Sequence, residues 1–185
     1  MIIKTARFGQ ITVGEMGEEI ITIPQGLLGF PDFTKYCLVD PIDETLILWL
    51  QSIENPDLSF PVLEPKIFKP DYHARLSALE LRELNLANLS QSAVFTVLTI
   101  PEDISLMTAN LKAPIVINLK EQIAKQVVLQ ENDFSIKHPM FKELRIHLVT
   151  IASQKRILGG EISDTPACVP VPIKSIPPSL TVKNL

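Results

Sequence analysis

The stretches Leu46-Ile47-Leu48-Trp49-Leu50 and Val94-Phe95-Thr96-Val97-Leu98 decide the fold of this chain of 185 residues. Successive side chains of a β-strand point to opposite faces of its sheet, so a strand with one solvated face alternates between apolar and polar residues. Both stretches are instead apolar on both alternations. We therefore expect them to be central strands covered on both faces, as in a β-sandwich or a closed β-barrel.

Further strand-like runs surround these two stretches. They are rich in β-branched residues, which favour strands, and turn residues such as Gly, Pro, Asn and Asp separate them. Short turns of this kind connect antiparallel strands, whereas parallel strands need long crossovers. The sequence therefore predicts a mainly β protein, an antiparallel β-barrel-like single domain. With the central stretches included, the runs are 2–8, 10–13, 19–23, 36–40, 46–53, 60–63, 93–100, 113–118 and 125–130.

One short helix is predicted over residues 78–85. Ser77 and Glu80 fit a capping box, in which the Ser77 hydroxyl accepts from the Glu80 backbone N–H and the Glu80 carboxylate reaches back. Either Asn85 or Asn88 could end this helix. Its apolar stripe, expected to pack on the sheet, consists of Leu79, Leu81, Leu84 and Leu86.

The chain is expected to consist of a β domain, residues 1–139, and a C-terminal extension, residues 140–185. Residues 140–158 fit a helix or a strand equally well. Five prolines crowd residues 166–178. Because proline disfavours both helix interiors and central strands, we expect an extended, mobile tail from about residue 164.

The charge of the chain is divided in the same way. Residues 1–138 hold 11 Lys and Arg against 18 Asp and Glu, a net charge of −7, whereas the remainder carries a net charge of +3. A strongly basic footprint, typical of proteins that bind nucleic acid, is therefore absent as a global property. We expect no direct contact with nucleic acid.

The sequence shows no motif of a catalytic or cofactor-binding site. Its seven glycines form neither dinucleotide-binding nor P-loop spacing, and its three histidines and two cysteines lack zinc-site spacing. We therefore expect no enzyme activity, no cofactor and no metal. Cys37 lies in an apolar run, which predicts a buried thiol.

Composition also predicts the compartment. Two widely spaced cysteines are typical of a reduced, cytoplasmic protein. No apolar run approaches the roughly 18 residues that cross a membrane. We expect a cytoplasmic protein without membrane contact.

Two sets of residues are candidates for binding a protein partner. Turn acids commonly bond their own backbone, but together they could also form an acidic rim that steers a basic partner. A methionine-containing loop can adapt to a partner, or it can simply build a bend and a strand entry. Trp49 is expected in the core rather than at an interface. The acids are Asp43, Glu44, Glu54, Asp57, Glu102 and Asp103, and the loop residues are Met107, Asn110 and Leu111.

Several segments resemble the FliW family of flagellar assembly factors, in order from Met1 to about Pro139. The most specific is Met107-Thr108-Ala109-Asn110-Leu111-Lys112-Ala113-Pro114-Ile115-Val116-Ile117-Asn118. The others are Phe30-Pro31-Asp32, Trp49-Leu50-Gln51-Ser52 with Asn55-Pro56-Asp57-Leu58-Ser59-Phe60-Pro61-Val62, Lys69-Pro70-Asp71-Tyr72, Ile100-Pro101-Glu102-Asp103 and Gln126-Val127-Val128-Leu129. No family pattern continues after His138-Pro139.

The resemblance implies a cytoplasmic, non-catalytic bacterial protein with a β-barrel-like fold. Proteins of this family bind newly made flagellin like a chaperone, and they bind and antagonise CsrA, an RNA-binding translational regulator that represses flagellin mRNA. The alternative within this class is an export chaperone that binds flagellin alone. A small β-barrel enzyme or sugar-binding module is the remaining, remote class. In each binding case the acids and loop residues above are the candidate contacts.

Overall fold

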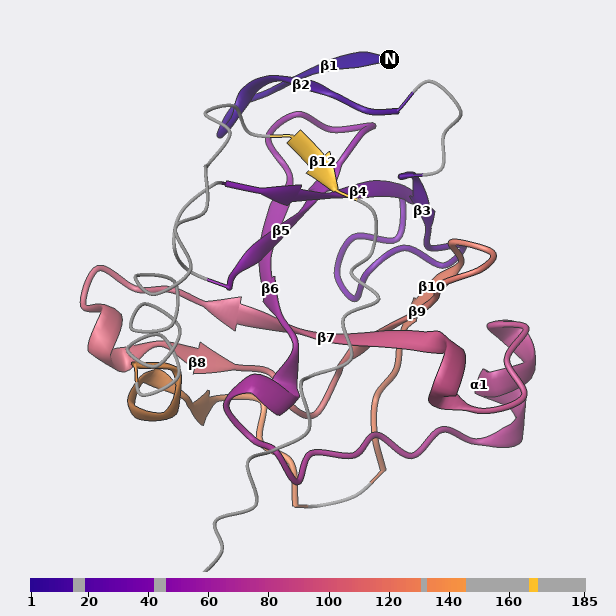
Figure 1. The fold of residues 1–185 in the computed structure, drawn as a ribbon, viewed down its shortest axis with the longest axis vertical. Helices are drawn as coiled ribbons and strands as arrows, with labels where there is room; N and C mark the ends of the chain where they lie inside the picture. Colours follow the sequence, from indigo (N-terminus) through magenta and orange to yellow (C-terminus); the bar gives the residue numbers. More distant parts are fainter. Residues whose placement is uncertain (15–18, 42–45, 131–132, 146–166, 170–185) are drawn as a thin grey trace, which may run out of the picture.

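The computed structural model describes residues 1–14, 19–41, 46–130, 133–145 and 167–169 (Figure 1). Ten of the described strands form one antiparallel sheet, and β1 and β2 form a separate hairpin. The sheet runs β10-β9-β7-β6-β5-β4-β12; β3 pairs with β4, and β8 pairs with β7 and β11. In chain order the strands are β1 (Ile2–Thr5), β2 (Gly9–Thr12), β3 (Ile21–Thr22), β4 (Lys35–Asp40), β5 (Leu48–Ser52), β6 (Ser59–Leu63), β7 (Ser92–Thr99), β8 (Thr108–Ala109), β9 (Ile115–Asn118), β10 (Ala124–Gln126), β11 (His138–Pro139) and β12 (Ala167–Val169).

Each run predicted to be a strand contains one, and the prediction of a mainly β, antiparallel fold is confirmed. The sheet carries apolar cores on both faces. In β9, Ile115 and Ile117 belong to one core and Val116 to another. In β4, Leu38 and Val39 likewise point into different cores. The doubly apolar runs therefore mark strands that are covered on both sides.

The described strands do not close into a barrel, which corrects the barrel-like expectation. β3 reaches the opposite end of the sheet only through an isolated parallel bridge between Thr22 and Ile123. There the Thr22 N–H donates to the Gln122 carbonyl at 2.8 Å. Pro24 follows two residues after Thr22 and has no N–H to continue a ladder. The sheet consequently stays open along a seam between β3 and β10.

A proline occupies the central strand β6, where proline is normally excluded. Pro61 lies opposite Trp49 of β5, whereas pairing with β7 begins only at Val62. Pro61 therefore pairs with a neighbour on one side only, as it would in an edge strand. This local pairing explains how a proline fits inside the sheet.

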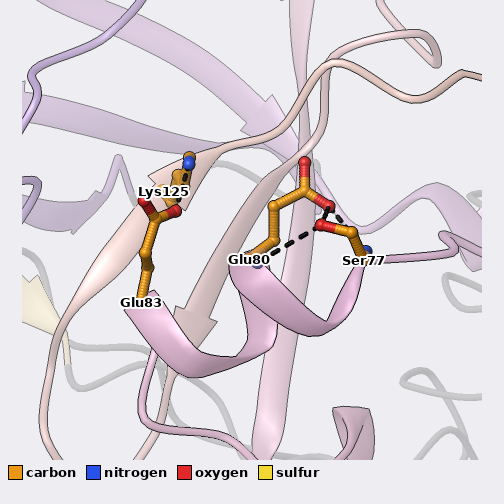
Figure 2. Close-up of polar contacts among 4 residues, drawn as sticks. All are labelled: Ser77, Glu80, Glu83 and Lys125. Carbon is orange, nitrogen blue, oxygen red and sulfur yellow. Dashed lines mark hydrogen bonds and ion pairs between the residues drawn. The ribbon is translucent and has the colours of Figure 1, made fainter.

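The predicted helix is present as α1 (Ala78–Glu83), with its capping box (Figure 2). The Ser77 N–H donates to the Glu80 carboxylate at 2.6 Å, and the Glu80 N–H donates to the Ser77 hydroxyl at 3.3 Å. Asn85 ends the helix with φ of 53°, the left-handed conformation that asparagine tolerates better than most residues. The described residues also form three 3₁₀ turns: η1 (Pro65–Ile67), η2 (Leu89–Gln91) and η3 (Ile104–Leu106).

The apolar stripe predicted for the helix is only partly correct. Leu84 and Leu86 are buried, but the side chain of Leu79 is 64% exposed. The helix is only six residues long, and the described residues Ala78–Glu83 include no fully buried one. Leu81 of the helix is half-buried and packs against the core, and the fully buried contacts, Leu84 and Leu86, come from the chain that leaves the helix.

The β1–β2 hairpin packs on the outer face of β4 and β5. Trp49 is half-buried there, in edge contact with Phe8 at a centroid distance of 5.8 Å. The Arg7 guanidinium carbon lies 3.9 Å from the centroid of the Trp49 ring, and the Ala6 N–H donates to the Pro56 carbonyl at 3.0 Å. Cys37 is fully buried beneath this hairpin, as predicted.

The first residues after β11 join the core of the β body. Residues 141–145 are helical, and Met140 and Leu144 are buried in the same cluster as Leu63 and Leu98. Of the two alternatives for residues 140–158, the helix is therefore the one observed in the described part, and residues 146–158 lie outside it. Of the expected tail, the described part is β12, which is extended and pairs with β4.

Candidate protein-binding surface

The loop between β7 and β8 presents the apolar side chains Ile100, Ile104 and Leu106 to solvent, with exposed fractions of 38%, 54% and 66%. Asp103 caps the η3 turn inside this loop, because its carboxylate accepts from the Ser105 N–H at 3.0 Å and from the Ser105 hydroxyl at 2.6 Å. These hydrogen bonds lower the pKa of the Asp103 carboxyl. The loop thus holds an apolar surface beside two acids, Glu102 and Asp103.

The structure places the predicted loop residues behind this surface. Met107 is 6% exposed and Leu111 1% exposed, both in the core. The Asn110 side-chain oxygen accepts from the N–H groups of Lys112 and Ala113, at 3.2 and 3.0 Å, and so turns the chain into β9. These residues position the loop, and the exposed apolar side chains beside them are those of Ile100, Ile104 and Leu106.

Sequence reasoning passed over Ile104 and Leu106, although a signal was present. Apolar residues in a turn that begins Pro-Glu-Asp are too few and too close to a proline for a strand. When such a short segment is left without a sheet partner, its apolar side chains have nowhere to be buried. Isolated exposed apolar residues are ordinary, but three in one loop form a patch of the kind that marks interaction sites.

Of the six candidate acids, Glu54 and Asp57 lie in the β5–β6 turn. The Glu54 carboxylate accepts from the backbone N–H groups of Thr34 and Lys35, at 2.6 and 2.9 Å. The hydrogen bond from Lys35 is the main reason that the pKa of Glu54 is lowered. Asp57 is exposed. Its backbone N–H, not its carboxylate, forms the hydrogen bond to the Asn55 side chain, which accepts. Glu54 therefore joins two strands, whereas the carboxylate of Asp57 points into solvent.

A buried amide organises this turn from within. Gln51 is fully buried. Its Nε2 atom lies 2.9 Å from the carbonyl oxygen of Ser52, 3.2 Å from that of Asn55, 3.4 Å from that of Pro56 and 3.1 Å from that of Leu58. Two amide protons are thus shared among four carbonyl groups, and the turn winds around one side chain.

The expected acidic rim is not one cluster among the described residues. Figure 1 shows the β5–β6 turn beside the β1–β2 hairpin and the β7–β8 loop at another side of the molecule. Asp43 and Glu44 lie outside the described residues. Any electrostatic attraction of a basic partner would therefore come from separate groups of acids on the surface.

The role of Glu54 in joining two strands predicts a pH-dependent effect of Glu54→Gln. A carboxyl whose pKa is lowered by folding stabilises the folded state above its unfolded pKa, here 4.5, and that stabilisation is lost as pH falls through the folded pKa. We expect the variant to unfold at lower urea concentration than the parent near pH 7, with the difference shrinking below pH 4.5. Glu102→Gln is the control, and a pH-independent difference for Glu54→Gln would contradict the prediction.

Among the hollows that the described residues form, one of about 590 Å³ is open to solvent and is lined by Lys112 and residues 134–137. A hollow of about 190 Å³ lies at the β3–β10 seam, smaller than the roughly 300–1,000 Å³ typical of ligand pockets. Its charged lining residues, Glu83 and Lys125, form an ion pair with each other (Figure 2). Within the described ranges, no group of three His, Cys, Asp or Glu could hold a metal ion. In the same part of the chain, no helix is long and apolar enough to span a membrane.

An antiparallel sheet with exposed apolar side chains in one loop is typical of mainly β proteins that bind other macromolecules. The family model described as FliW protein matches residues 2–140. On this match the chain belongs to the FliW family of flagellar assembly factors, as the sequence segments predicted.

The relatives agree with this assignment. A flagellar assembly factor FliW of Bdellovibrio bacteriovorus is 44% identical over 149 residues, which are 80% of this chain and 84% of the relative. That of Geobacter sulfurreducens is 37% identical over 163 residues, 88% of this chain and 99% of the relative. A crystal structure of the flagellar assembly factor FliW aligns with a TM-score of 0.70 and 33% identity, covering 76% of this chain and 97% of that one.

Proposed function

We propose that this chain is a cytoplasmic, non-catalytic regulator that binds flagellin and the translational regulator CsrA, and that it relieves the repression of flagellin mRNA by CsrA. Membership of a family of flagellar assembly factors supports the pathway. The observation that supports a binding role is the exposed apolar loop Ile100, Ile104 and Leu106. Because flagellin and CsrA would compete for the protein, the state of the switch follows from mass action.

The apolar loop has the composition of an interface core. Protein interfaces bury apolar side chains at their centre and surround them with polar residues, and a few central side chains contribute most of the affinity. Ile104 and Leu106 are the most exposed apolar residues of the loop, and Glu102 and Asp103 adjoin them. In the proposed complex the two apolar side chains enter a hollow on the partner.

Charge would act on CsrA in a second way. A protein that binds RNA must present basic residues to phosphate groups, and this electrostatic attraction supplies much of its affinity. Residues 1–138 carry a net charge of −7. An acidic protein bound beside the basic surface would lower its positive potential and weaken RNA binding without occupying the RNA site. Asp43, Glu44, Glu54, Asp57, Glu102 and Asp103 are the proposed acids.

The test of the apolar loop is the double variant Ile104→Ala with Leu106→Ala. We expect the affinity for flagellin or CsrA to fall about tenfold or more, as for central interface residues. The control is Leu28→Ala with Leu79→Ala, whose side chains are 57% and 64% exposed but lie on other elements. Equal affinities of the two double variants, measured by calorimetry, would exclude the loop as the binding surface.

The test of charge is the double variant Asp57→Lys with Glu102→Lys. These two acids are chosen because Glu54 and Asp103 hold backbone N–H groups, so their reversal would also disturb the turns. We expect weaker CsrA binding, less release of RNA from CsrA and a smaller salt dependence. If all three quantities match the parent, the electrostatic mechanism is wrong, while the apolar loop can still be correct.

A sizing column with the purified chain, flagellin and CsrA tests the proposal as a whole. A shift of both partners supports it. A shift of flagellin alone would instead support an export chaperone that does not bind the regulator. If neither partner shifts, the proposed function is wrong.

A further inference from the structure

The C-terminal extension returns to the β body as a strand. β12 pairs antiparallel with β4, with Ala167 opposite Asp40 and Val169 opposite Leu38. It lies between β4 and the hairpin strand β2 (Figure 1). The family match ends at residue 140, so β12 comes from a part of the chain that the family model does not include. The edge of β4 lies within the segment that the family model matches, whereas the strand that covers it lies after that segment.

Backbone alternation shows what β12 covers. The Lys35 carbonyl of β4 accepts from the Ile53 N–H on the β5 side, at 3.0 Å. The N–H and C=O groups of successive residues in a strand point to alternate edges. Leu38 and Asp40, three and five positions after Lys35, therefore direct these groups to the edge of β4 that faces away from β5. On that edge β3 pairs only with the beginning of β4. Without β12, the backbone groups of Leu38 and Asp40 would form an open site for another strand.

The covering strand is short. β12 has three residues, and only Ala167 and Val169 direct their N–H groups to β4. So short a strand pairs weakly by itself, and it is effective because the chain holds it at a local concentration on the order of millimolar.

We propose that Leu38–Asp40 of β4 is a strand-addition site which the chain's own segment Ala167–Val169 occupies, and which accepts an extended segment of a partner protein when that segment leaves. Main-chain hydrogen bonds give the affinity in this mode of recognition. The C-terminal extension is then an internal competitor that raises the partner concentration needed for binding. This inference does not depend on which partner binds the β7–β8 loop.

Hydrogen exchange in the full-length protein tests the occupied state. Ala167→Pro with Val169→Pro removes the two N–H groups that face β4, whereas Cys168→Pro, the control, introduces proline where the N–H faces away. We expect the amides of Leu38 and Asp40 to exchange about tenfold or more faster in the double variant. Amides of Cys37 and Val39, which face β5, should keep their rates within about twofold. Unchanged exchange at Leu38 and Asp40 would show that β12 does not cover this edge.

The site itself is tested by adding a strand in trans. The probe is a synthetic peptide of residues 164–172, supplied at about millimolar concentration to the double variant. Renewed protection of Leu38 and Asp40 supports the proposal, and the same peptide carrying both proline substitutions should give none. If neither peptide restores protection, the edge is not a strand-addition site. A concentration-dependent dimer of the double variant without peptide would overturn the assignment to a partner protein in favour of a second copy.

Discussion

Replacement of Gln51 by methionine is expected to lower the free energy of unfolding by about 2 kcal/mol. Methionine preserves the length of the side chain but has no proton to donate, so the carbonyl groups of the β5–β6 turn lose the hydrogen bonds of two amide protons. The carbonyls of Asn55, Pro56 and Leu58 keep a backbone N–H donor, so each lost hydrogen bond costs roughly 0.5–1.5 kcal/mol rather than the full penalty of an unpaired group. For a protein of this size the melting temperature should fall by about 4–8 °C.

The control for this prediction is Gln130→Met. Gln130 is exposed, and its Nε2 atom donates only to the Val128 carbonyl, at 3.3 Å. Its replacement should change the free energy of unfolding by less than about 0.5 kcal/mol. Urea denaturation of both variants measures the difference. Equal stabilities would mean that the turn does not depend on the Gln51 amide.

Leu111→Ala is expected to cost about 3–4 kcal/mol, because it removes a leucine from a packed core and leaves a cavity. The residue is 1% exposed, its N–H donates to the Ser135 carbonyl at 3.0 Å and its carbonyl accepts from the Tyr72 hydroxyl at 3.0 Å. The substitution leaves these backbone bonds in place, so the loss measures packing. Calorimetric melting and urea denaturation report it.

The same variant separates a structural role from direct contact with a partner. The protein that remains folded should bind its partners with an affinity within about threefold of the parent, since little of Leu111 is accessible. Ile104→Ala should behave oppositely, with stability nearly unchanged and binding weakened. A Leu111→Ala protein that is stable but does not bind would place Leu111 at the interface and contradict its position in the core.

Much of the fold could be predicted because local signals and burial agree. The apolar runs around Trp49 and Phe95 identified covered strands, and Ser77 with Glu80 identified the start of α1. β8 and β11 have two residues each, too few to show alternation. β12 could not be predicted either, because its place depends on a partner strand more than a hundred residues away and its proline neighbours indicated an extended, mobile tail.

The candidate surface was predicted by segment but not by side chain. Glu102 and Asp103 lie in the loop that carries the exposed apolar side chains, yet which apolar residues of this loop are buried and which are exposed depends on the single η3 turn. That turn directs Ile104 and Leu106 outward and returns Met107 to the core. Sequence periodicity carries no information about such a turn. The closure of the sheet was likewise unpredictable, since it depended on whether β3 continues beyond Thr22.

Trp49, the single tryptophan of the chain, lies where the hairpin rests on the sheet, beneath Arg7 and Phe8. Its indole is therefore a natural optical reporter of this junction. Lifting of the hairpin would expose the ring to water and shift its emission to longer wavelength, without any attached dye. Intrinsic fluorescence can thus follow this corner of the molecule during titrations when light that excites tryptophan, and not the two tyrosines, is used.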